Sequence, residues 1–120
     1  MKNPETVPES IRRSVVILRC RGLELDAADR QELHRSEMAF GHVFQRIPRI
    51  ELKFLARPRE VDLQCEVRAL SGEFAATATG ANVREALQSV TQKILKQKRR
   101  AKTISMTRRR VLPARRARST

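Results

Sequence analysis

The sequence has no tryptophan and no tyrosine, and four phenylalanines are its only aromatic residues. All four fall at positions of apolar periodicity, so we expect them in a core rather than on a surface that stacks against nucleotide bases. The lack of other aromatics therefore argues against an RNA-recognition module that binds bases on its sheet.

Long apolar segments are missing as well. The longest uninterrupted run is Val15–Leu18, far short of the about 20 residues that a membrane-spanning helix needs. The first ten residues contain Pro4, Pro8 and two glutamates where a signal peptide would have an apolar core. The basic C-terminal tail also lacks a bulky apolar face that would insert into a membrane. We expect a soluble, cytoplasmic protein that does not bind membranes.

No sequence motif of an enzyme or a metal site is present. Cys20 and Cys65 lack C-x-x-C spacing and a nearby histidine pair, so we expect buried thiols and no metal or redox site. His34 and His42 have no ligand or base pattern around them. There is no P-loop, no G-x-S-x-G and no Gly-Gly-Gln tripeptide of a release-type hydrolase. We expect no enzymatic activity, no cofactor and no small-molecule substrate.

Acidic residues are absent from the last 35 residues. Residues 1–85 carry 14 Lys/Arg against 13 Asp/Glu, whereas residues 86–120 carry 12 Lys/Arg and no acid. Almost all of the net charge of +13 is therefore at one end of the chain. Because unopposed cations repel one another and phosphates attract them, this distribution predicts a polyanionic partner.

Hydrophobic periodicity predicts four strands and two helices. In chain order they are a strand over Ser14–Arg21, a helix from Asp26 to about Phe44, strands over Arg49–Arg57, Val61–Ala69 and Phe74–Thr79, and a helix that follows Asn82 and runs to Lys102. The inward positions of the first strand are Val16, Leu18 and Cys20. Those of the first helix are Leu33, Phe40, Val43 and Phe44, in a stripe that Glu37 interrupts.

This order, β-α-β-β-β-α, predicts an α+β fold. The third strand alternates most regularly, with Leu63, Cys65 and Val67 on one face and Gln64 and Glu66 on the other. Such alternation leaves one face of the sheet in water. We therefore expect a four-stranded sheet with two helices packed on one face, a right-handed parallel crossover between the first two strands and hairpins after it.

The chain is short enough to form one domain. Residues 1–10 are interpreted as a polar N-terminal arm, residues 11–102 as the α+β domain, and residues 103–120 as a basic, disordered tail.

The last predicted helix has two different faces. Its apolar stripe consists of Val83, Leu87, Val90 and Ile94. Beside the stripe and in the last turn lie the candidate RNA-binding residues Lys93, Lys96, Lys98, Arg99, Arg100 and Lys102. In an ordinary domain a solvated helix face would be the better explanation of these cations, but here no acids offset twelve cations in 35 residues, which favours contact with RNA.

Arg30 and Arg35 on the first helix are further RNA-binding candidates. They lie near Asp29, Glu32 and Glu37, so pairing within the helix explains them almost as well as contact with RNA.

Two segments resemble the ribosome hibernation-promoting factors, a family also described as ribosome-associated inhibitors and sigma-54 modulation proteins. The segments are GLELDAADRQEL, at the start of the first helix, and GEFAATATGANVREALQSVTQKILKQKRR, which covers the last strand and helix. The resemblance extends over about residues 15–102. It departs from the family pattern at Asn82-Val83-Arg84, where Asp-x-Tyr is usual.

The resemblance implies a short family member without the dimerising C-terminal domain, monomeric away from the ribosome. Such a protein would bind the small ribosomal subunit in the channel for mRNA and tRNA, contact ribosomal RNA and keep ribosomes idle. The same element order also fits a general double-stranded RNA-binding or ribosomal-protein-like module. Equal binding to free RNA duplexes and to ribosomes would favour that alternative.

Overall fold

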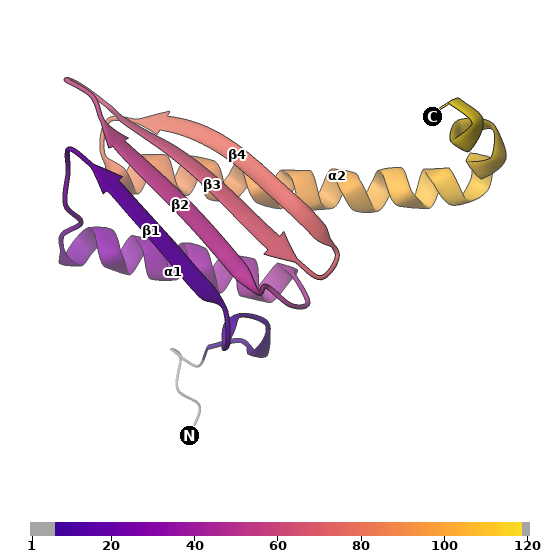
Figure 1. Cartoon of the computed structure of the whole chain (residues 1–120), viewed down its shortest axis with the longest axis horizontal. Helices are drawn as coiled ribbons and strands as arrows, with labels where there is room; N and C mark the ends of the chain where they lie inside the picture. The colour runs from indigo at the N-terminus through magenta and orange to yellow at the C-terminus, as the bar shows by residue number, and fades with distance from the viewer. Residues whose placement is uncertain (1–6, 119–120) are drawn as a thin grey trace.

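The computed structural model describes the backbone of residues 7–118 and the side chains of residues 7–101. Its elements are the 3-10 helix η1 (Glu9–Ile11), β1 (Val15–Arg21), α1 (Ala27–Val43), β2 (Arg49–Ala56), β3 (Val61–Ala69), β4 (Gly72–Gly80) and α2 (Val83–Arg118). The strands form one sheet in the order β1-β2-β3-β4, and both helices lie on the same face of it (Figure 1). The predicted α+β class and element order are confirmed.

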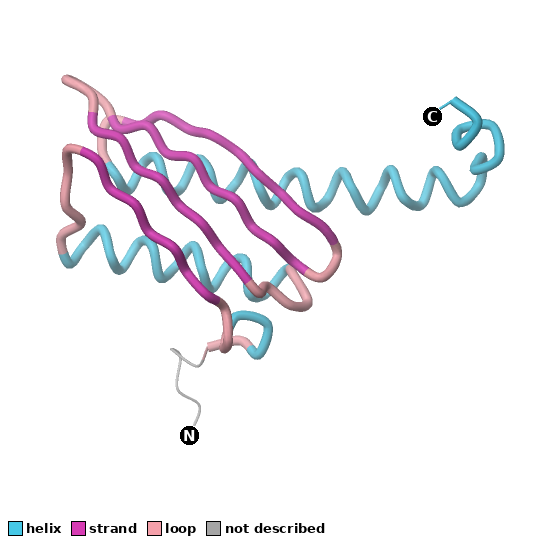
Figure 2. The backbone as a smooth tube through the Cα atoms, in the orientation of Figure 1, coloured by secondary structure: helices cyan, strands magenta, loops and turns pink. Residues whose placement is uncertain are grey.

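The pairing of the strands follows the predicted topology (Figure 2). β1 pairs with β2 in parallel, with Val16 opposite Ile50, and α1 makes the crossover between them. β2–β3 and β3–β4 are antiparallel neighbours, and their tight connections keep consecutive strands adjacent. β1 and β4 are therefore the two edges of the sheet.

The apolar stripe of α2 is packed into the core. Leu87, Val90 and Ile94 are completely buried, and Val83 is 7% exposed. On β4, Ala76 and Ala78 face this helix, and their small side chains let it lie close to the sheet. α2 is thus fixed by its apolar side while its other sides carry the basic residues.

Both helices begin at side-chain caps that the sequence predicted. Asp26 accepts a hydrogen bond from Asp29 N at 2.7 Å, and Asp29 Oδ2 accepts one from Asp26 N at 3.2 Å. For α2, Asn82 Oδ1 accepts from Glu85 N at 2.9 Å. These bonds satisfy backbone donors that would otherwise have no partner at a helix start.

Of the polar arm predicted over residues 1–10, residues 7–10 pack against the rest of the domain, and residues 1–6 lie outside the described part of the chain. Ile11 in η1 is buried. Two hydrogen bonds of Ser10 hold the segment in place: its Oγ donates to Gly41 O, and its carbonyl oxygen accepts from Ile47 N at 2.9 Å. Gly41 permits this packing, because a Cβ there would lie 3.1 Å from side-chain atoms of Ile11 and Pro8. Gly41 therefore lowers the helix propensity of α1 but makes room for the close contact with η1.

The prediction that Cys20 is buried was wrong. Val16, Leu18 and Cys20 are on the core face, as their pairing with the inward residues of β2 shows, but Leu18 is 40% exposed and Cys20 is exposed too. They lie on an edge strand that neither helix covers closely. Val43 was also predicted inward and is 42% exposed, because it is the last residue of α1.

Glu37, which interrupts the stripe of α1, is half-buried. Burial raises the pKa of Glu37 above the usual glutamate value, and the charge of His34 opposes this shift. The helix tolerates the carboxylate because its side chain is not enclosed.

α2 continues past Lys102, where the predicted helix ended. The structure has helical backbone as far as Arg118, and the division of the chain into arm, domain and disordered tail stays a prediction. Figure 1 shows this part of α2 projecting beyond the sheet. The boundary proposed at residue 102 is thus not a helix end.

A pair of aspartate substitutions on β3 tests the sheet faces. Leu63 is 0% exposed and Gln64 is exposed, so Leu63→Asp should unfold the domain and Gln64→Asp should not. An unpaired carboxylate in an apolar site costs several kcal/mol, a large part of the about 5–15 kcal/mol that stabilises a typical domain. Thermal unfolding followed by circular dichroism measures the difference, and equal melting temperatures would contradict the register.

The two thiols should differ in reactivity. Burial and the neighbouring charge of Glu66 raise the pKa of Cys65 to about 12, so its thiol is both protonated and enclosed at neutral pH. Cys20 is accessible, although partial desolvation raises its pKa and the charge of Arg30 counteracts that rise. Iodoacetamide labelling read by mass spectrometry should modify Cys20 alone under native conditions, and Cys65 only after denaturant is added. Labelling of Cys65 first would show that the core is wrongly placed.

Candidate nucleic-acid interface

One side of α2 lies along the free edge of β4. Lys93 Nζ donates to Thr77 O at 2.7 Å, and Gln97 Nε2 donates to Ala75 O at 2.6 Å. Residues four apart on a helix lie on one side of it, about 6 Å apart along its axis, which nearly matches the spacing of alternate residues on a strand. Lys93 and Gln97 thus cover backbone carbonyls that would otherwise be free at the sheet edge.

Lys93 remains available to a second partner. Its side chain is exposed, and an ammonium group has three donors, of which the bond to Thr77 uses one. This lysine has a structural role that its spacing alone did not reveal.

Lys96 and Arg100 are exposed and form no ion pair among the residues with described side chains. From the helical rotation of 100° per residue, Arg100 lies on the same side of α2 as Lys93, and Lys96 points further from the sheet. The predicted stripe of these three cations is therefore continuous along the helix surface.

The last predicted turn contributes differently. Lys98 is half-buried: its Nζ is 3.4 Å from Ser71 Oγ and 5.7 Å from the centre of the Phe44 ring. This contact favours a structural role for Lys98, because a cation over an aromatic face is attracted by the ring. Arg99 is exposed, and the side chain of Lys102 lies outside those that the structure describes.

Arg30 and Arg35, the two candidate arginines of α1, belong to the same helical layer as the cations of α2. α1 lies beside α2, and Thr91 Oγ1, which donates to Leu87 O at 2.6 Å, is 2.9 Å from Ser36 Oγ between the helices. Arg35 pairs with Glu32 at 3.6 Å but remains 75% exposed, whereas Arg30 has no ion pair within the described part of the chain. Both line an open hollow of about 820 Å³ on the outer side of α1.

We call the outward-facing cations of the two helices the helical cation surface. Its members are Arg30, Arg35, Lys93, Lys96, Arg99 and Arg100. They are presented by two helices that contact each other and share a core, so their spacing is set by the fold. Such a surface fits the phosphate groups of a nucleic acid better than a small molecule, since its cations are spread over two helices.

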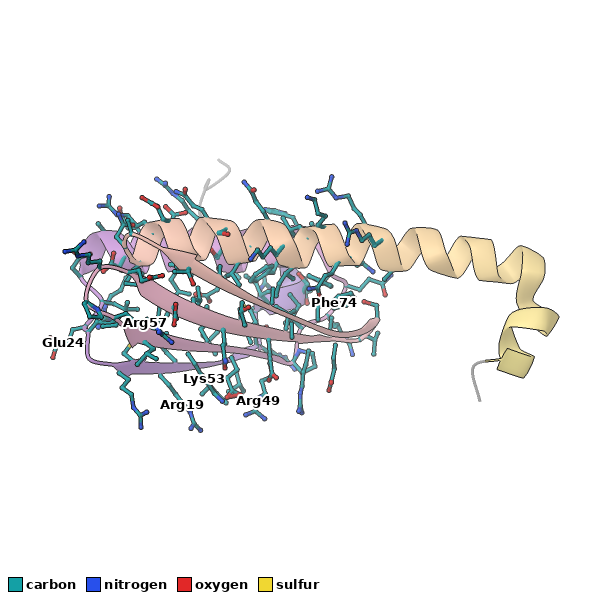
Figure 3. All side chains as sticks on the ribbon, turned by 90° about the horizontal axis from the view of Figure 1, so that it is seen from above. Arg19, Glu24, Arg49, Lys53, Arg57 and Phe74 are labelled. Carbon is teal, nitrogen blue, oxygen red and sulfur yellow. The ribbon has the colours of Figure 1, made fainter. Side chains whose placement is uncertain are left out.

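The sequence-based candidates omitted Arg19, Arg21 and Lys53. Figure 3 shows Arg19, Arg49 and Lys53 projecting from the face of the sheet that the helices leave open. Strand alternation placed these side chains outward, but their proximity required the register in which Arg19 is opposite Lys53.

Neither a metal site nor a membrane segment is found in the part of the chain that the structure describes. No cluster of three or more His, Cys, Asp or Glu side chains there could hold a metal ion. None of the helices searched there has the length and apolar character to cross a membrane.

Solved structures with a similar fold include two that are described by name. One is a ribosomal subunit interface protein from Coxiella burnetii, with 16% sequence identity, a TM-score of 0.59 and coverage of 73% of this chain and 97% of that chain. The other is the N-terminal domain of Protein Y from Thermus thermophilus, with 12% identity, a TM-score of 0.63 and the same coverage of both chains. The resemblance predicted from the sequence is thereby confirmed at the level of the fold.

No protein-family model and no curated protein matches the sequence. The similarity is therefore one of three-dimensional structure.

Proposed function

We propose that this protein is a ribosome-associated factor that binds ribosomal RNA of the small subunit in the mRNA and tRNA channel and keeps ribosomes idle. The observation that carries the proposal is the helical cation surface. In it Lys96 and Arg100 are exposed and have no acidic partner among the described side chains, and they lie on a helix fixed by a buried stripe. The fold shared with a ribosomal subunit interface protein supports the ribosome as the source of that RNA.

Binding by a fixed helix has an energetic advantage. Cations that keep their spacing lose less conformational freedom on docking than those of a flexible segment. The protein would act by occupying the channel and not by chemistry, so no catalytic group is part of the proposal. It would need no cofactor and would work as a monomer.

A general double-stranded RNA-binding module is the alternative. The element order and the basic last helix fit both, and the alternative would bind a free RNA duplex as tightly as the small subunit. A direct comparison of the two affinities at one salt concentration separates them.

The variant Lys96→Gln/Arg100→Gln tests the proposal. Glutamine keeps helix propensity and the buried stripe is untouched, so the fold should be retained. If both residues contact phosphates, binding to small ribosomal subunits should weaken, and the slope of log K against log salt should flatten by about 1.4–1.8. Co-sedimentation over a salt series measures the slope, and an in vitro translation assay should show reduced inhibition.

The matched control is Arg12→Gln/Arg68→Gln. It removes the same charge, but Arg12 pairs with Glu9 at 3.4 Å and Arg68 pairs with Glu73 at 3.3 Å, away from α2. The control should bind and inhibit like the unmodified protein. Identical behaviour of the two variants would refute the assignment of the helical cation surface.

A further inference from the structure

The face of the sheet opposite the helices has an uneven charge distribution. Its outward positions in β1 and β2 include four cations and one acid, namely Arg19, Arg21, Arg49, Lys53 and Glu51. Those in β3 and β4 include one cation and three acids, namely Arg68, Asp62, Glu66 and Glu73. The open face is thus basic along one edge and acidic along the other.

Three of these cations form what we call the open-face cluster: Arg19, Arg21 and Lys53. Arg19 is directly opposite Lys53 on the neighbouring strand, about 5 Å away at the backbone, and Arg21 is two residues further along, at about 7 Å. All three side chains are exposed, and Figure 3 shows two of them, Arg19 and Lys53, pointing away from the helices.

The acids nearest to the cluster already have other partners. Asp62 pairs with Arg57 and accepts a hydrogen bond from Thr79 Oγ1 at 2.9 Å. Glu51 pairs more closely with Arg49 (Oε2 to Nη2, 3.3 Å) than with Lys53 (Oε1 to Nζ, 3.9 Å). Arg19 and Arg21 have no ion pair among the described side chains, so their charge is available to a ligand.

The cluster also borders a hollow of about 530 Å³ on the sheet. Its lining includes all three cluster residues, together with the Arg57–Asp62 ion pair, the exposed Leu55 and the neutral Gln64. The hollow offers cations, an amide, one carboxylate that is already paired and one apolar side chain, and Phe54, the aromatic residue of its lining, is buried.

We propose that the open-face cluster is a second phosphate-binding surface, which contacts the backbone of an RNA strand on the side of the domain opposite to α2. The lack of an aromatic platform predicts contacts to phosphates without base stacking, and therefore without sequence preference. The inference rests on the proposed function, because a domain placed within an RNA-lined channel meets phosphates on more than one side.

A second surface changes how the domain binds. With cations on both faces, RNA segments on either side can be held at once, and the second contact forms at a high effective concentration. The domain would thus bridge two RNA segments and not bind a single one.

Fluorescence anisotropy with a short, labelled single-stranded RNA tests this surface in the intact protein. The variant Arg19→Gln/Arg21→Gln should bind more weakly, and its salt slope should be about 1.4 less steep, from 0.7 per phosphate contact on a single strand. The control Arg12→Gln/Arg68→Gln has the same net charge and should retain the original slope. Arg68 is on the same open face as the cluster, so the control also tests whether any cation of that face would suffice.

Three results would overturn the inference. One is an unchanged slope for Arg19→Gln/Arg21→Gln in folded protein. Another is an unchanged slope combined with aggregation in light scattering, which would show that the arginines only protect the edge of β1 from pairing with another strand. The third is loss of binding to poly-glutamate with no loss of binding to RNA, which would indicate an acidic protein partner.

The same variants distinguish this inference from the proposed function. If Lys96→Gln/Arg100→Gln loses binding to small subunits while Arg19→Gln/Arg21→Gln keeps normal binding to both RNA and subunits, only the second surface is refuted. If RNA binding depends on the open-face cluster but neither variant affects binding to subunits, the assignment of subunit binding to the helical cation surface fails and the phosphate-binding surface stands.

Discussion

The packing of the α2 stripe on the sheet is the interaction on which the rest of this structure depends. Leu87, Val90 and Ile94 are completely buried, and the alanines of β4 let the helix approach closely. This contact stabilises the domain through the apolar area it removes from water. It also fixes the orientation of α2, so that Lys93 reaches the edge of β4 while Lys96 and Arg100 face solvent. The core and the candidate RNA-binding surface are thus two sides of one helix.

The sequence was sufficient to predict the element order, the sheet topology and the helix starts. Those features depend on local patterns, such as the strict alternation around Leu63 and the cap at Asn82, which tertiary contacts reinforce. The exposure of Cys20 could not be predicted in the same way. Alternation shows which face a residue is on, but whether a strand lies at the edge, beyond the reach of the helices, depends on the assembled sheet.

The candidate site shows the same division. Spacing along α2 correctly grouped Lys93, Lys96 and Arg100 on one side of the helix, because that relation is local. It could not show that Lys93 also donates to Thr77 O, or that Arg19 and Lys53 are adjacent, since both relations join segments far apart in the chain. Charge composition predicted a polyanionic partner and placed it on the last helix, whereas the register of the sheet reveals a second group of cations.

The central claim is that α2 presents its cations to ribosomal RNA. Lysine acylation of the free protein and of its complex with small ribosomal subunits, read by mass spectrometry, tests that claim most directly, because Lys96 is exposed in the free domain and has no ion pair among the described side chains. The account predicts that Lys96 is acylated readily in the free protein and is strongly protected in the complex. Equal acylation of Lys96 in the two states, with the protein demonstrably bound, would contradict it.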